Sequence, residues 1–324
     1  MEQRARIALA GLGTVAFFLV VQFGALALVE PFKAAGYQSV EDPQNPVNSV
    51  VYLGVILVAT AAMLLLMRYD RTRILRLFLV FTSGLIAGYV FAVWLPPVRV
   101  AALGGVNLSP YLGGAVVVAG LLWYPEWWVI DAAGLLMGMG AGALFGISFG
   151  ILPAILLLSV LAVYDAISVY GTKHMLTLAS GVMELRVPVL VIVPTTPSYS
   201  FIAEASAMAD SVDDEAAGEA AEERSAMERD AFFIGLGDAV MPSIMVASAG
   251  FFLQTPTVFG VELAPLGAIV GTVVGLIVLL WMVAKGRAHA GLPLLNGGAI
   301  GGYLVAALAS GIPLVRALGL SGVL

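Results

Sequence analysis

The sequence predicts an all-α, polytopic membrane protein with nine transmembrane helices. Of its 324 residues, 60% are hydrophobic and only 11% are charged, and the mean hydropathy is +1.01. This composition exceeds what a soluble domain needs for its core, and the apolar runs are long enough to cross a bilayer. Cysteine is absent, which excludes disulfides, thiol nucleophiles and cysteine-ligated metals.

Turns rich in proline, glycine or charge separate the apolar runs, and each run is interpreted as one span. The first run is too long for the hydrophobic region of a signal peptide and lacks a small-residue cleavage site. Four arginines form a basic turn before the third run, and Pro125-Glu126-Trp127-Trp128 suits a membrane interface, where indole rings favour the headgroup level. The predicted spans are residues 6–29, 47–67, 77–95, 108–124, 129–150, 151–170, 231–253, 263–284 and 292–317.

The fifth run carries glycines at a strict four-residue spacing, at positions Gly134, Gly138, Gly142, Gly146 and Gly150. Residues with this spacing lie near one face of a helix. Small residues there let a second backbone approach closely, so we expect helix packing rather than direct chemistry.

The basic residues indicate the orientation. If the N-terminus is cytoplasmic, only Lys33, Arg99 and Arg316 of the 15 lysines and arginines fall outside. Cytoplasmic loops of membrane proteins carry an excess of these residues. We therefore expect a multi-pass protein of the cell membrane with an external C-terminus.

The net charge of −6 arises in one connection. Residues 204–230 contain ten acidic residues and two arginines, and they are typical of a mobile linker or a short solvated helix. The chain is therefore divided into residues 1–170 with helices one to six, a cytoplasmic loop at residues 171–230, and residues 231–324 with helices seven to nine.

Two carboxylates lie inside apolar runs that have no lysine or arginine in their central parts. Asp165 follows Tyr164 in the sixth run, and Asp238 lies about two helical turns into the seventh. An acid in such a place costs at least ~2.5 kcal/mol and indicates function. Because the two runs are antiparallel, both acids are expected about 10 Å from the cytoplasmic face, at ~1.5 Å per residue.

Two carboxylates in a low dielectric with no cation cannot both ionise. One should hold a proton while the other acts as a base on water, which is the chemistry of aspartic proteolysis. The glycines of Gly235-Leu236-Gly237 leave space in front of Asp238 for an extended peptide or a facing helix.

The motifs Tyr164-Asp165 and Gly235-Leu236-Gly237-Asp238, with Leu292-Pro293 at the start of the ninth run, resemble the signature of the presenilin and signal peptide peptidase family. These are GxGD intramembrane aspartyl proteases. The resemblance covers nearly the whole chain and implies a presenilin-like fold, an aspartic endopeptidase with no cofactor or metal, and Asp165 and Asp238 as its catalytic pair. Tyr164, Gly235, Leu236 and Gly237 would shape the site around them.

The third motif departs from the family pattern. Where the family has Pro-Ala-Leu, this chain reads Ala290-Gly291-Leu292 and then Pro293. Leu292 matches, Gly291 matches loosely and Ala290 does not. Pro293 either leaves backbone groups free near the acids or simply opens the ninth helix at its first position.

Features of both branches of the family are present. The cytoplasmic N-terminus is similar to presenilins, whereas residues 170–194 are more similar to signal peptide peptidases, so a prokaryotic, archaeal-type homologue fits best. The resemblance implies substrates that are single-span membrane proteins or signal-peptide remnants in the lipid bilayer, and no nucleic acid. Residues 187–193 are β-branched and bounded by prolines, and we expect either a strand that pairs with an unwound substrate or an amphiphilic surface loop.

Other mechanisms fit these residues less well. Gly146-Ile147-Ser148-Phe149-Gly150 matches G-x-S-x-G, but both histidines, His174 and His289, fall in cytoplasmic connections far from Ser148. A zinc mechanism has too few ligands. A proton- or cation-coupled transporter is the main alternative, because such carriers also use lone intramembrane acids. A purely structural pair of protonated aspartates is the remaining one.

Overall fold

A computed structural model describes residues 2–69, 71–100, 105–172, 188–194, 199–203, 231–283 and 289–320. Helices dominate this part of the chain, as the all-α class requires. They are α1 (Glu2–Ala34), α2 (Val47–Arg68), α3 (Thr72–Trp94), α4 (Ser109–Trp123), α5 (Trp127–Ser148), α6 (Ile151–Ile167), α10 (Leu236–Phe252), α11 (Leu263–Val283), α12 (Leu292–Ala309) and the short α13 (Leu314–Ala317).

Seven of the described helices are long and apolar enough to cross a membrane. Two shorter apolar helices, α4 with 15 residues and α10 with 17, complete the set. The multi-pass class is confirmed, and the count of nine crossings stays a prediction. The acidic segment, residues 204–230, and His174 lie outside the described residues.

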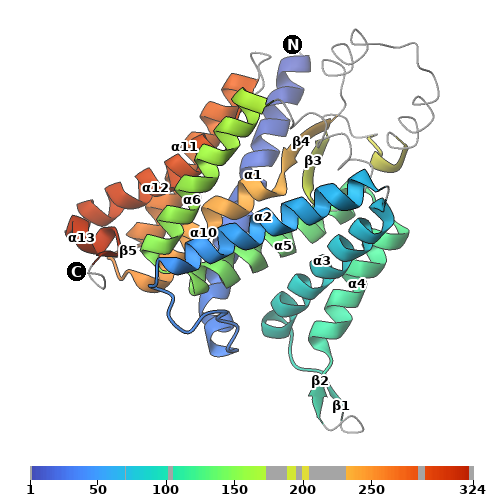
Figure 1. Ribbon diagram of the computed structural model, residues 1–324, viewed down its shortest axis with the longest axis horizontal. Coiled ribbons are helices and arrows are strands. Elements are labelled where there is room, and N and C mark those ends of the chain that lie inside the picture. The colour runs from blue at the N-terminus through green and yellow to red at the C-terminus, as the bar shows by residue number, and fades with distance from the viewer. Residues whose placement is uncertain are drawn as a thin grey trace.

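Three short antiparallel ribbons join the helices in the described part of the chain. The hairpin β1 (Arg99–Val100) with β2 (Val106–Asn107) and the hairpin β5 (Thr257–Val258) with β6 (Val261–Glu262) are local turns. The third ribbon pairs β3 (Leu190–Pro194) with β4 (Ala231–Gly235) across the connection between α6 and α10. It lies at the end of the bundle near the N-terminus, opposite the β1–β2 hairpin (Figure 1).

The seventh predicted span is corrected at its start. Residues 231–235 form strand β4, and α10 begins at Leu236, so Asp238 lies in the first helical turn instead of two turns inside. Phe232, Phe233 and Ile234 are aromatic or β-branched and suit a strand as well as an apolar helix. Pairing with β3 decides between the two, and the extended Gly235 (φ −61°, ψ 128°) ends the strand.

Other boundaries also differ. The basic turn is shorter than expected, because Arg73 and Arg76 already belong to α3. The ninth helix ends at Ala309 instead of residue 317, since Gly311 adopts φ +79° and Pro313 follows. A positive φ suits glycine, and a proline cannot continue a helix. The short α13 then returns to α12, where the Tyr303 hydroxyl donates a 2.7 Å hydrogen bond to the Ala317 carbonyl.

The glycines of α5 lie against other helices, which confirms their expected packing role. A methyl group at Gly146 would overlap Ala247 of α10, and one at Gly142 would overlap Ser243. Glycines also allow α11 and α12 to pack closely against each other. A methyl group at Gly271 would overlap the backbone carbonyl of Gly298, so these two backbones are in direct contact.

We expect Gly271→Ala to destabilise the protein by about 2 kcal/mol, because the added methyl meets backbone that cannot move aside. Thermal unfolding in detergent measures this loss as a lower Tm. Gly54→Ala on α2 is the matched control, since a methyl there has open space around it. An unchanged Tm in Gly271→Ala would contradict the close approach of α11 and α12.

Candidate active site

Asp165 lies in the last turn of α6, directly before a short π-helical segment, Ser168–Thr172. Its Oδ2 accepts a 3.0 Å hydrogen bond from the backbone N–H of Leu292, and the amide of Gly291 also faces this carboxylate. These amides open α12, where the first N–H groups have no partner within the helix. An anion at this place is favoured by the free N–H groups and by the helix dipole.

Pro293 suits the start of α12, where these amides are free. It occupies the first turn of α12 and has no N–H, and the helix begins at Leu292 after Gly291 (φ −78°, ψ −48°). The two interpretations of Pro293 therefore coincide: it opens the helix, and the amide before it is left for Asp165.

Asp238 lies in the first turn of α10 and is close enough to Asp165 for the two carboxyl groups to interact electrostatically. Gly291 links them. A Cβ at Gly291 would lie 3.2–3.3 Å from the carboxyl atoms of Asp238. The dipeptide Gly291-Leu292 thus contacts both acids, which places the three motifs from α6, α10 and α12 in one site.

The other predicted site residues differ in how closely they approach the two acids. Gly237 is exposed, with no atom within 4 Å of where a Cβ would be, so the approach to Asp238 is open there. A Cβ at Gly235 would lie 3.5 Å from Asp238 Oδ2. Leu236 is buried against α5 instead of facing the acids, and Tyr164 beside Asp165 is 54% exposed.

The strand expected at residues 187–193 is confirmed over Leu190–Pro194, but its partner is the chain's own β4. Leu190 pairs with Gly235 and Ile192 with Phe233, and the Leu236 N–H extends the ladder with a 2.8 Å bond to the Val189 carbonyl. The edge of β3 that faces away from β4 is also hydrogen-bonded, because the Ile192 N–H donates to Asp131 Oδ1 at 2.8 Å. The ribbon therefore leads directly into the helix that carries Asp238.

Asp131 is the residue that sequence reasoning missed. It lies one turn into α5, where an acid near a predicted helix end resembles an ordinary interfacial charge. The available signal was its position inside an apolar run, three residues after the Trp-Trp pair.

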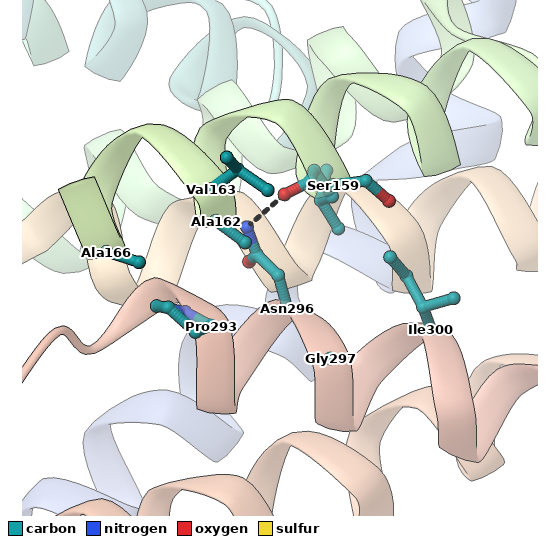
Figure 2. A pocket seen from close by; sticks show the side chains of 9 residues that line it. Ser159, Ala162, Val163, Ala166, Pro293, Asn296, Gly297 and Ile300 are labelled. Carbon is teal, nitrogen blue, oxygen red and sulfur yellow. Dashed lines mark hydrogen bonds between the residues drawn. The ribbon is translucent and has the colours of Figure 1, made fainter.

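A cleft of about 240 Å³ lies between α6 and α12 next to the acids. Figure 2 shows Ala166 and Pro293 at one end and Ile300 at the other, with Asn296 reaching from α12 toward α6. The Asn296 amide donates a 3.0 Å hydrogen bond to the Leu158 carbonyl. Because Ala166 follows Asp165 and Pro293 follows Leu292, this end of the cleft adjoins the site, although neither acid lines the cleft.

A family model described as "Signal-peptide peptidase, presenilin aspartyl protease" matches residues 15–312. The chain belongs to this family. It is similar to a solved presenilin family intramembrane aspartate protease in the C222 space group, with 35% identity, a TM-score of 0.63, and coverage of 92% of this chain and 99% of the other. It is also similar to a second such structure, in the P2 space group, with 36% identity, a TM-score of 0.61, and coverage of 92% of this chain and 97% of the other. No match is found among curated proteins.

This presenilin-family chain is therefore an intramembrane aspartyl protease, an aspartic endopeptidase, with a presenilin-like fold. The transporter alternative has no support from these comparisons. The G-x-S-x-G alternative also fails on geometry. Ser148 is the last residue of α5 and lies beside the start of α6, whereas Asp165 lies near the end of α6. Ser148 is fully buried, and the Ser148 Oγ accepts a 3.0 Å hydrogen bond from the Ser39 N–H.

Proposed function

We propose that Asp165 and Asp238 are the catalytic pair with which this protease hydrolyses peptide bonds of transmembrane segments. The observation that carries the proposal is the contact of Gly291-Leu292 with both carboxyl groups. The division into residues 1–170, 171–230 and 231–324 puts one acid in the first part and the other in the last, so the site is assembled from both.

The two carboxyl groups have different roles in this mechanism. Asp165 holds the ionised position, because backbone N–H groups stabilise a carboxylate there. Asp238 holds the proton. Asp165 removes a proton from water as the water oxygen adds to the scissile carbonyl carbon, and Asp238 gives its proton to the carbonyl oxygen. Collapse of the resulting diol breaks the C–N bond, and the amine leaves with a proton from the pair.

Strand β4 gives an unwound substrate a place to pair. The Ile192 N–H points to Asp131, so in the Ile192–Phe233 pair the backbone groups face away from the partner strand. Ala231, Phe233 and Gly235 therefore present their backbone to the edge of β4 that β3 leaves open. In the described residues this sheet has two strands, so a substrate strand would be the third, added by β-augmentation beside Asp238.

The substrates that fit are single-span membrane proteins or signal-peptide remnants. The α6–α12 cleft is lined mainly by apolar side chains and starts at Ala166 and Pro293, which supports lateral entry of an apolar helix (Figure 2). A helical peptide bond is shielded and hydrogen-bonded, so the substrate unwinds before it pairs with β4. The enzyme lies in the cell membrane with a cytoplasmic N-terminus and an external C-terminus, and the cut falls near the cytoplasmic side.

Purified protein with a single-span peptide in liposomes tests the activity. In H₂¹⁸O, we expect mass spectrometry to find one ¹⁸O in each new carboxyl terminus, because water attacks directly. Hydroxylamine should trap no hydroxamate, since an aspartyl protease forms no acyl-enzyme. Absence of cleavage, or a hydroxamate product, would contradict the proposed mechanism.

A further inference from the structure

Helix α5 holds strand β3 through one carboxylate. Asp131 Oδ1 accepts the Ile192 N–H at 2.8 Å, and Ile192 and Val191 are each only 1% exposed. A buried N–H without a partner costs free energy, so β3 is most stable in the position where Asp131 accepts this hydrogen bond. Ile192 also packs in a cluster with Ile130 and Ala133, the neighbours of Asp131 on α5.

The same helix holds the start of α10. The Leu236 side chain lies over Gly134 and Gly138, with its Cδ1 3.7 Å from where a Cβ on either glycine would be. Leu236 in turn donates its N–H to the Val189 carbonyl of the β3 segment. The β3–β4 ribbon is thus fixed to α5 at Asp131 on one side and at the glycines on the other, and Asp238 follows two residues after Leu236.

A second carboxylate, that of Glu126 at the N-cap of α5, also binds the connection. Glu126 accepts the Ser200 hydroxyl at 2.7 Å and the Phe201 N–H at 3.1 Å, which ties the later part of the connection to the beginning of the helix. The Glu126 hydrogen bonds reach neither strand of the ribbon in the described residues, although Phe201 packs against Phe233 of β4, with ring centroids 6.5 Å apart. It anchors the connection without setting the register beside Asp238.

We propose that Asp131 is a positioning residue for peptide hydrolysis. It fixes β3, and through the ladder β4, at the height where the open edge of β4 brings one substrate bond to Asp238. The inference rests on the proposed catalytic pair and on the proposed substrate edge. Its consequence is that Asp131 determines which peptide bond is cut, as well as how fast.

Asp131→Ala removes the acceptor, and Asp131→Asn keeps an oxygen that accepts the same N–H. We expect the alanine variant to show a kcat lower on the order of tenfold with little change in KM, and a shift of product termini to neighbouring bonds. The asparagine variant should restore wild-type termini and most of the rate. Mass spectrometry of the peptides from a single-span substrate gives both readouts.

Ser200→Ala is the control, because it weakens the Glu126 tie and should leave the cleavage positions unchanged. If Asp131→Ala shows no thermal unfolding transition and is therefore not folded, Asp131→Ser is used instead. The serine side chain is too short to reach the position from which Asp131 accepts the hydrogen bond. Wild-type termini and kcat in a folded Ala or Ser variant overturn the inference, as does an Asn variant as defective as Ala. Cleavage that persists in Asp238→Ala would instead refute the proposed catalytic pair, so the two failures are distinguishable.

Discussion

Asp238→Asn is expected to lower the cleavage rate at least about a thousandfold, and Asp165→Asn to do the same. Asparagine keeps the shape of the side chain and can still hydrogen-bond, but it cannot exchange a proton with water or with the peptide carbonyl. The two variants should therefore fold as the wild type does, with Tm values within a degree or two. The loss is measured as the initial rate of cleavage of a single-span peptide.

The wild-type enzyme should show a bell-shaped pH dependence. At low pH both carboxyl groups are protonated and no base remains, and at high pH both are ionised and no acid remains. The two apparent pKa values of such a profile belong to the pair and not to either residue. A rate that rises or falls steadily with pH would contradict the division of roles between Asp165 and Asp238.

Asp42→Asn is the matched control. Asp42 lies in the loop after α1 and accepts the Gln44 N–H, a hydrogen bond that asparagine can also accept. The same chemical change there should leave the rate unaltered. Full activity in either Asp165→Asn or Asp238→Asn would exclude the acid pair as the catalytic machinery.

The placing of the two acids side by side follows from the sequence because their runs are antiparallel neighbours. Asp165 is near the end of one run and Asp238 near the start of the next, so they meet at one end of the bundle. Polar residues at intramembrane positions and a short β-branched segment bounded by prolines are equally local signals. Each of these features is visible within about 20 residues, which is the length of one span.

Features that depend on a distant partner could not be predicted. Residues 231–235 are as apolar as the helix that follows, and only pairing with β3 makes them a strand. The hydrogen bond of Asp131 is to Ile192, a residue in another part of the chain, so the role that we propose for it has no local signal. The glycine contacts of Gly271 with Gly298 also arise only when α11 and α12 pack.

Gly291→Val is expected to lower kcat by about a hundredfold, because it pushes the Asp238 carboxyl away from its position beside Asp165. A Cβ at Gly291 would already lie 3.2 Å from Asp238 Oδ2, and valine adds two methyl groups to that carbon. Displacement of a reacting group by about 1 Å can cost about 100-fold in rate. The backbone of Gly291 (φ −78°) is open to any residue, so the effect comes from the side chain.

Gly291→Ala separates this crowding from a simple need for glycine. The family motif that this chain resembles has alanine at the corresponding place, and a single methyl requires the end of the Asp238 side chain to move only a few tenths of an ångström. We therefore expect alanine to retain activity within about threefold, with valine far below it. Gly301→Val on the same helix has open space around it and should keep the wild-type rate. Equal activity of the valine and wild-type enzymes would mean that Gly291 does not set the separation of the two acids. The contact of Gly291-Leu292 with both carboxyl groups would then have no role in catalysis.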